Sequence, residues 1–491
     1  MKQVSTITKE ASITTKNISA VVLLRVLQYP FLFLAVTLIP RLMGPEIYGE
    51  YALLISIIVI SSSIVYLGFG EVLVRFVPEL EIHGESASTV RLSSNILAFK
   101  VAVDLVVSIV LFSILNLAYG DRFSIIYFLL IVVILLVADV GSIPYFLLFG
   151  LNKLGKYSLR DPFRRALGLV FILILFNYYG LVGAIASTLL VETSLAILYF
   201  FWTRRYFRIE SFGIDLSLLK PYLKFGFIFY ISVGILNIWQ RLGNPLIEYI
   251  TRDSREVALF DIPNQILLMV LNFIPILITY FIPIFTELLL TGKEGKLINW
   301  SNLIMKYIGT FCTIIFFGFI LMGPDLIPII IGSKYKGIFP NGIVLLLAIF
   351  PMSFAQLGSV FSLVYKEPRK YLQALCFAFS TFLVVSILLI PKYASMGCAI
   401  ATFISSMVLA VVLYFYFREK LLPCLADGLK TVFLGFIFVP FLFFRGGLIT
   451  NLSLAVCSVL VYILLLFIIR ALNLDEIKEI SRAIRYRPLE L

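Results

Sequence analysis

Two long apolar stretches of the sequence each carry an arginine beside amide side chains. Arg25 and Gln28 are three residues apart, so they project from one face of a helix. The second stretch carries Asn237, Gln240 and Arg241. A guanidinium inside a membrane costs at least about 2.5 kcal/mol on insertion scales, so it is expected to face water or a partner. The pattern indicates the walls of a polar cavity, or else arginines that pair with buried carboxylates or snorkel.

Acidic side chains inside apolar stretches form a second group of candidates. Asp139 and Glu192 are candidates for ion coupling, because a buried carboxyl group can take up a proton or coordinate Na⁺. The alternative is structural bonding between helices. Asp104 follows Lys100 by four residues and is expected to pair with it, whereas Lys100 and Lys306 are expected to snorkel.

Catalytic and metal-binding constellations are not found in the sequence. The single histidine, His83, excludes a histidine-based metal site, and the five cysteines lie in or beside apolar stretches without a C-x-x-C motif. The spacing of a phosphate loop is also missing, so ATP-driven pumping has no support in this chain. We therefore expect no enzyme, no metal and no cofactor other than a coupling ion, Na⁺ or H⁺.

The composition fixes the class of protein. Hydrophobic residues make up 61% of the chain and charged residues 14%, and the mean hydropathy is +1.03. Apolar runs of about 20 residues, the length that crosses a bilayer, predict an all-α polytopic membrane protein with about 14 transmembrane helices. Twelve helices is the alternative count.

Basic residues predict the orientation of these helices. The chain has a net charge of +12, and its lysines and arginines are concentrated in alternate loops and in both tails. Because basic loops stay on the cytoplasmic side, both termini are predicted to be cytoplasmic, with the chain in the cytoplasmic membrane. This distribution accounts for the positive charge without nucleic acid as a partner.

An internal repeat divides the chain. Residues 156–204 match residues 370–418 at a constant offset of 214, for example Lys156 with Lys370 and Gly183 with Gly397. Six spans separate equivalent helices, which indicates a parallel repeat of two six-helix lobes followed by two C-terminal helices. The predicted divisions are an N-terminal tail (1–17), a first lobe (18–207), a cytoplasmic linker (208–219), a second lobe (220–418), the helices 13 and 14 (419–472) and a C-terminal tail (473–491).

A turn near the start of the chain carries a family resemblance. Arg41-x-x-Gly-Pro-Glu-x-Tyr-Gly-x-Tyr-Ala is followed by Gly68-x-Gly and by Arg75-Phe-x-Pro-Glu. With these motifs the chain resembles the polysaccharide-biosynthesis flippases. That family belongs to the superfamily of multidrug and toxin exporters and lipid-linked oligosaccharide flippases.

The resemblance implies a flippase that moves a polyprenyl-linked oligosaccharide across the membrane by alternating access. It also implies that the helices opening each lobe line a cavity, which makes the substrate-binding candidates Arg25, Gln28, Asn237, Gln240 and Arg241. Membrane lipids, a glycan polymerase and glycosyltransferases are the expected partners. The alternatives are a Na⁺- or H⁺-coupled multidrug exporter, a peptidoglycan-precursor flippase and, more remotely, a membrane glycosyltransferase. Exporters of cationic drugs favour acidic residues in the first or seventh helix, which weighs against the exporter.

Overall fold

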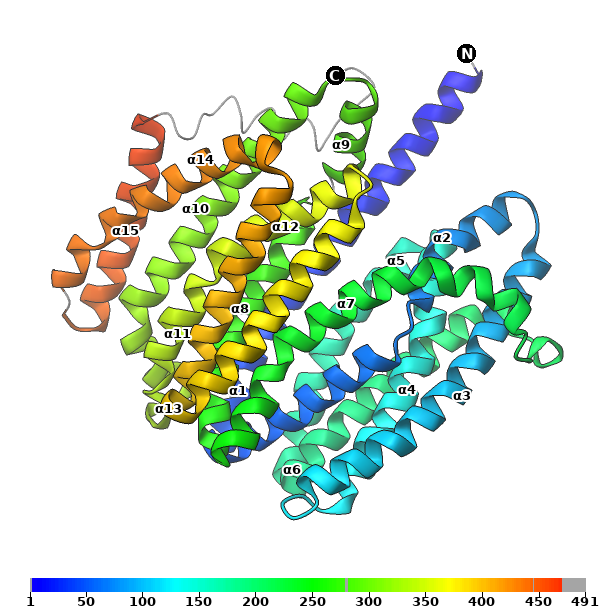
Figure 1. Ribbon diagram of the computed structural model, residues 1–491, viewed down its shortest axis with the longest axis horizontal. Coiled ribbons are helices and arrows are strands. Elements are labelled where there is room, and N and C mark those ends of the chain that lie inside the picture. Colours follow the sequence, from blue (N-terminus) through cyan, green and yellow to red (C-terminus); the bar gives the residue numbers. More distant parts are fainter. Residues whose placement is uncertain (1, 279–280, 445, 470–491) are drawn as a thin grey trace. The chain divides into compact units, whose positions relative to one another are not determined.

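The structure, a computed structural model, describes residues 2–278, 281–444 and 446–469, and its regular elements are helices (Figure 1). Nine helical segments in these ranges are long and apolar enough to cross a membrane. Their outer surfaces expose large apolar side chains, as on α3 (Ser86–Tyr119), where Ile109 is 69% and Leu117 is 90% exposed. Because water would not tolerate such surfaces, the chain is a multi-pass membrane protein, and the predicted all-α class is confirmed.

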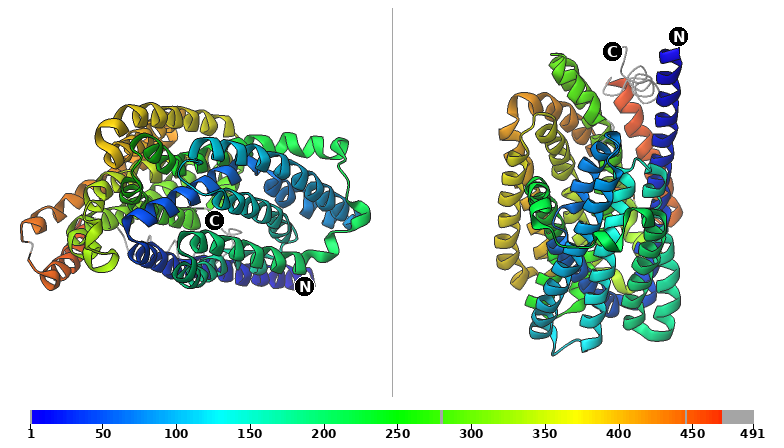
Figure 2. Two further views of the ribbon diagram at one scale, coloured as in Figure 1. Left: turned by 90° about the horizontal axis from the view of Figure 1, so that it is seen from below. Right: turned by 90° about the vertical axis from the view of Figure 1, so that its right-hand side faces the viewer.

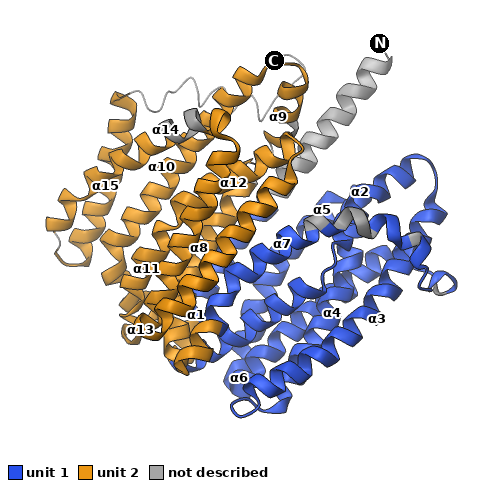
Figure 3. Cartoon of the chain, in the orientation of Figure 1, with its two compact units in different colours: residues 1–39, 46–245 blue, residues 40–45, 246–491 orange. Residues whose placement is uncertain are grey.

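The chain divides into two compact units, coloured separately in Figure 3. Unit 1 contains residues 1–39 and 46–245, and unit 2 contains residues 40–45 and 246–491. Most of α7 (Leu216–Thr251) therefore belongs to unit 1, whereas the sequence-based division begins the second lobe with it. The predicted lobe boundaries stay a prediction, and the C-terminal tail (473–491) lies outside the described residues.

Unit 1 is a helical bundle around α4. Its elements are α1 (Lys2–Val65), α2 (Phe69–Ile82), α3, α4 (Ile125–Gly150), α5 (Leu154–Ser158), α6 (Arg160–Thr203), η1 (Arg204–Tyr206), η2 (Ile209–Ser211) and α7. Helix α4 packs against α2, α3 and α6. Figure 2 shows the helices from two further sides. A β-carbon added at Gly141 of α4 would lie 2.9 Å from the β-carbon of Ala196 on α6. Small residues therefore set the spacing of these helices.

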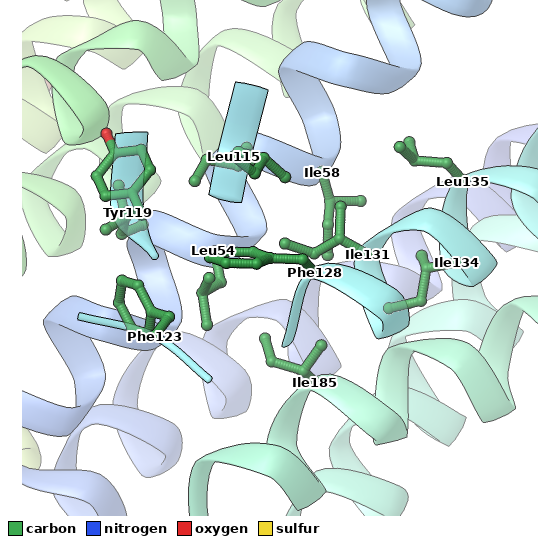
Figure 4. Packing of buried hydrophobic residues seen from close by; sticks show 12 residues of the cluster. Leu54, Ile58, Leu115, Tyr119, Phe123, Phe128, Ile131, Ile134, Leu135 and Ile185 are labelled. Carbon is green, nitrogen blue, oxygen red and sulfur yellow. The ribbon is translucent and has the colours of Figure 1, made fainter. Parts of the chain in front are cut away.

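The apolar core of unit 1 joins α1, α3, α4 and α6 (Figure 4). Phe128 and Ile131 of α4 lie at its centre with no exposed surface, between Leu54 of α1 and Ile185 of α6. Lipid tails are as apolar as these side chains, so exclusion of water contributes little to this contact. Close van der Waals packing stabilises it instead.

Unit 2 is a second helical bundle. Its elements are α8 (Ser254–Ile278), α9 (Phe281–Leu290), α10 (Glu294–Leu326), η3 (Ile327–Ile331), η4 (Ser333–Tyr335), α11 (Ile338–Leu347), α12 (Ile349–Val364), α13 (Pro368–Tyr416), α14 (Arg418–Leu434), η5 (Gly435–Phe438), η6 (Pro440–Phe444) and α15 (Leu448–Ile468). Helix α10 packs against α14, α12 packs against α13, and α8 packs against α11. A β-carbon at Gly309 of α10 would lie 2.5 Å from Oγ1 of Thr431 on α14, so a glycine again permits close contact.

Three long helices contain one non-helical residue each. These residues are Gly44 in α1 (φ 77°), Gly180 in α6 (φ 57°, ψ −139°) and Ala394 in α13 (φ 47°, ψ −125°). Gly180 and Ala394 are 214 residues apart, which is the offset of the sequence repeat, and their backbone conformations are alike. The internal repeat therefore extends from the sequence to the backbone.

The chain reverses direction at the breaks in α6 and α13. The tyrosine hydroxyl of Tyr416 donates a 3.0 Å hydrogen bond to Gln373, a residue near the other end of α13. A straight helix would separate residues 43 positions apart by about 65 Å, so the two arms of α13 must lie antiparallel. The hydroxyl of Tyr199 likewise reaches the carbonyl of Lys156 across α6, at 3.4 Å. The number of membrane crossings, fourteen by prediction, stays a prediction.

The segment between α6 and α7 is bonded to the start of α3. The Asn95 amide donates to the Ser211 carbonyl (3.3 Å), and its oxygen accepts from the backbone N–H of Asp215 (3.0 Å). The Asp215 carboxylate also pairs with Arg91 at 3.0 Å. Because Asn95 is only 4% exposed, these bonds hold the predicted linker on the bundle of unit 1.

Candidate functional site

Arginine side chains from three helices of unit 1 are linked by electrostatic interactions that involve Tyr29 and Arg165. Tyr29 lies one turn beyond Arg25 on α1 and interacts electrostatically with Arg25, and also with Arg165 and Asp161 near the start of α6. Arg165 interacts in turn with Arg241 of α7. These five residues form the cationic cluster, which brings the two predicted arginines to one site although 216 residues separate them in sequence.

The local sequence places Arg165 in this cluster. Helix α6 begins at Arg160, with Pro162 in its first turn, where the missing proline N–H has no helical partner to lose. Arg165 is exposed, while Arg25, Asp161 and Arg241 are half-buried. Three guanidiniums therefore accompany one carboxylate at an accessible position, and this excess of positive charge attracts anions.

Two further arginines of α6 are engaged by Glu192. Arg164 lies 2.7 Å and Arg160 lies 3.9 Å from the Glu192 carboxylate, which is 3% exposed. The Arg160 guanidinium also lies over the ring of Tyr145, 4.3 Å from its centre. The two guanidiniums supply ion-pair partners for this carboxylate from the other arm of α6, which favours the structural interpretation of Glu192. Its role in ion coupling stays a prediction.

The amide side chains of the predicted site lie on α1 and α7, the helices that carry Arg25 and Arg241. Gln28 on α1, and Asn237 and Gln240 on α7, are half-buried. Asn237 precedes Arg241 by four residues, so the two share a helical face. Contact between these amides and a substrate stays a prediction.

The other coupling candidate, Asp139, lies in a buried ionic group. It pairs with Lys100 of α3, and Lys100 also lies 3.4 Å from Asp104, as the four-residue spacing predicts. Lys100 is 1% exposed, so the expectation that it snorkels is wrong. The reason is that two carboxylates supply its partners inside the bundle.

Sequence reasoning missed Arg165 and Asp161 as members of the site. From the sequence alone, the charged residues around Phe163 are assigned to a basic cytoplasmic loop between two spans. The signal was present in Arg160-Asp-Pro-Phe-Arg-Arg165, because a proline after an acidic residue is typical of a first helical turn. A helix that starts at Arg160 places all three arginines in its first two turns.

Comparisons with known proteins agree with this architecture. The profile of a family described as polysaccharide biosynthesis protein matches residues 14–289. The lipid II flippase MurJ, in an inward closed conformation, has a similar fold, with a TM-score of 0.67, 14% identity, and coverage of 90% of this chain and 97% of MurJ. Two structures of multidrug resistance MATE family transporters of the MOP superfamily are also similar, one inward-facing (TM-score 0.63, 16% identity, 81% and 94% coverage) and one outward-facing (TM-score 0.59, 15% identity, 84% and 96% coverage). No curated protein has significant sequence similarity to the chain.

Proposed function

Because the chain belongs to the polysaccharide biosynthesis protein family, we propose that it is a flippase that moves a lipid-linked oligosaccharide across the membrane. The fold it shares with the flippase MurJ and with MATE transporters supports transport. MATE family transporters are found in inward- and outward-facing conformations on this fold, which supports alternating access. Translocation makes and breaks no covalent bond, so the protein acts as a transporter and not as an enzyme.

The cationic cluster is the observation that carries the choice of substrate. A diphosphate that links a polyprenyl lipid to a sugar carries at least two negative charges, and arginine binds phosphate oxygens through two parallel N–H groups. Arg25, Arg165 and Arg241 provide three such groups from three helices. The lipid would remain in the bilayer while the cluster holds the diphosphate.

Two alternatives differ in the chemistry they need. An exporter of cationic drugs would need an excess of carboxylates, and the cluster contains only Asp161 beside its three guanidiniums. A peptidoglycan-precursor flippase would use the same diphosphate contact and differ in the glycan it carries. The likeness to MurJ supports this second alternative. Location in the cytoplasmic membrane, cytoplasmic termini, and glycosyltransferases or a glycan polymerase as partners complete the proposal.

The test is translocation by the full-length protein in liposomes. The probe is a fluorescent oligosaccharide on polyprenyl diphosphate, and its appearance in the opposite leaflet is measured. Arg25→Ala and Arg165→Ala should abolish translocation, and Arg25→Lys should retain part of it because the charge remains. Arg75→Ala is the matched control, because Arg75 is an exposed arginine paired with Glu79 on α2. Normal translocation by a stably inserted Arg25→Ala protein would overturn the proposal.

A further inference from the structure

Three charged side chains meet in the interior of unit 1, away from the cationic cluster. Lys100 and Asp104 lie on α3 and Asp139 lies on α4, and they are 1%, 2% and 6% exposed. The Lys100 ammonium donates to the Asp139 carboxylate and to the backbone carbonyl of Val65, and it lies 3.4 Å from the Asp104 carboxylate. These three residues form the charge centre.

The charge centre is unbalanced when all its groups are ionised. Two carboxylates would then face one ammonium, which leaves one uncompensated negative charge. Buried apolar side chains, including Ile96 and Ile143, pack beside it on α3 and α4. The two Asp104 oxygens accept no hydrogen bond from the described residues. An uncompensated charge in such surroundings is unfavourable, and one added proton removes it.

A proton fits this centre better than a metal cation does. The Lys100 ammonium already contacts both carboxylates, so a Na⁺ ion beside them would face a like charge at close range. A proton needs no coordination shell, and it can bond between the two carboxyl groups, since Asp104 interacts directly with Asp139.

We propose that Lys100, Asp104 and Asp139 form a proton-binding centre in which the two carboxyl groups hold one exchangeable proton. We propose further that this proton is coupled to transport through the junction of α1 and α2. The proton adds to a carboxylate oxygen and leaves from it, and no other bond is made or broken. Only the coupling rests on the proposed function, because proton binding itself needs no substrate.

The junction of α1 and α2 gives the centre a way to act on the fold. Val65, whose carbonyl accepts from Lys100, is the last residue of α1. The next residues include Leu67 and Gly68, with φ of 54° and 74°, so the chain turns sharply here. Loss of the proton leaves a buried negative charge that attracts Lys100 and water. Both effects weaken the Lys100 bond that holds the end of α1.

A chain of hydroxyl and carboxyl groups leads from the centre to α2. Tyr66 interacts electrostatically with Asp139, and its hydroxyl donates a 2.9 Å hydrogen bond to Glu71. Burial raises the pKa of Glu71, so this carboxyl group holds a proton at a higher pH than an exposed one does. The order Glu71, Tyr66, Asp139 is a route for proton exchange.

Outside the route for proton exchange, the other charged and titratable groups around the charge centre interact with residues other than its three members. From α5, Tyr157 interacts with Tyr66. On α2, Arg75 pairs with Glu79 at the exposed surface. Nearer the start of α3, Arg91 pairs with Asp215, and nine helical residues place it roughly 13 Å from Lys100 along the axis. The balance of charge at the centre is therefore set by its own three residues.

Infrared difference spectroscopy on the full-length protein in lipid tests proton binding without any substrate. At neutral pH the wild-type protein should show the carbonyl stretch of one buried protonated carboxyl group. Asp104→Asn and Asp139→Asn should each remove this band, because the remaining carboxylate then pairs with Lys100 alone. Asp325→Asn is the control in unit 2, where Asp325 accepts a 2.6 Å hydrogen bond from Asn451, and it should leave the band unchanged. A band that is missing from the wild type, or that survives either centre substitution, overturns the proton-binding centre.

The triple variant Lys100→Met, Asp104→Asn, Asp139→Asn replaces the three charged side chains with uncharged ones of similar size. Because no buried charge is left without a partner, this variant should fold even if the single variants do not. In liposomes with a pH gradient, it should move the fluorescent polyprenyl-diphosphate oligosaccharide at a rate that no longer depends on the gradient. Gradient dependence equal to that of the wild type would overturn the coupling. A wild-type protein that shows the band but moves no probe would overturn the proposed function and leave the proton-binding centre standing.

Discussion

The Arg164 guanidinium lies 2.7 Å from the Glu192 carboxylate although 28 residues of α6 separate them. The two residues stand on opposite sides of Gly180, so their ion pair joins the two antiparallel arms of this helix. Removing only Glu192 would leave Arg164 and Arg160 without that partner. Removing the charges of both Glu192 and Arg164 leaves fewer charged groups without a partner.

Glu192→Gln should therefore lower the free energy of unfolding by about 1 to 2 kcal/mol. The value is below that of a fully buried pair because Arg164 is 45% exposed to screening. Thermal unfolding of Glu192→Gln, Arg164→Met and the double variant would measure the coupling energy. Strict additivity would show that the pair does not join the two arms. Altered ion dependence of transport in Glu192→Gln, with normal stability, would support the coupling role instead.

A second prediction concerns stability at the cationic cluster. Arg165 lies near both Arg164 and Arg241, with Asp161 as its opposite charge. Without substrate these guanidiniums repel one another, so Arg165→Met should raise the free energy of unfolding by about 0.5 to 1 kcal/mol at low salt. The gain should shrink with added salt, while translocation is lost.

Arg75→Met on α2 is the control for this experiment, because it removes an exposed ion pair and should change stability little. A substrate analogue should stabilise the wild type and fail to stabilise Arg165→Met. If Arg165→Met unfolded at a lower temperature than the wild type at every salt concentration, Arg165 would be a structural residue.

A third prediction concerns pH. Burial raises the pKa of Glu71 above its ordinary value of 4.5, so the folded state binds this proton more tightly than the unfolded state does. The contribution of Glu71 to the free energy of unfolding is therefore fully present below pH 4.5. It is lost as the pH rises from there through the folded pKa of Glu71, by up to about 1.4 kcal/mol per pH unit. Glu71→Gln should flatten this part of the stability curve. The exposed Glu79→Gln should not, and identical curves for both variants would contradict the assignment.

At the breaks in α6 and α13, adding or removing the methyl group of alanine should have opposite effects on stability. Gly180→Ala places a β-carbon on a residue with φ of 57° and should cost about 1 to 3 kcal/mol, although no atom lies within 4 Å of that β-carbon. Ala394 already has φ of 47°, so Ala394→Gly should stabilise the fold by about 1 kcal/mol after the greater chain entropy of glycine is subtracted. Chemical denaturation measures both, and effects of the same sign would contradict the shared conformation.

The fold was largely predictable because its signals are local or repeat along the chain. Apolar runs located the helices, and the 214-residue offset pointed to equivalent positions, where Gly180 and Ala394 now share a conformation. The site was predictable only in part. Arg25 and Arg241 were recognisable because they are charged residues inside apolar sequence. Arg165 comes shortly after a proline among other charged residues, so the sequence assigns it to a loop. The burial of Lys100 depends on Asp139, which is 39 residues away on another helix, and such a contact leaves no local signal.

Lys306 matches Lys100 in the sequence at an offset of 206, close to the 214 of the main repeat, and four residues after Lys306 stands Thr310 in place of an acid. Thr310 directs its hydroxyl to the Lys306 carbonyl, so this position holds no exchangeable proton. If the centre in unit 1 drives transport, the stoichiometry is one proton for each substrate moved. One proton crossing a potential of 100 mV supplies about 2.3 kcal/mol, which corresponds to a roughly fiftyfold concentration ratio, and any charge that the diphosphate carries across adds its own electrical work. An acid in place of Thr310 would give the second half a proton-binding position as well and would double the energy that protons supply.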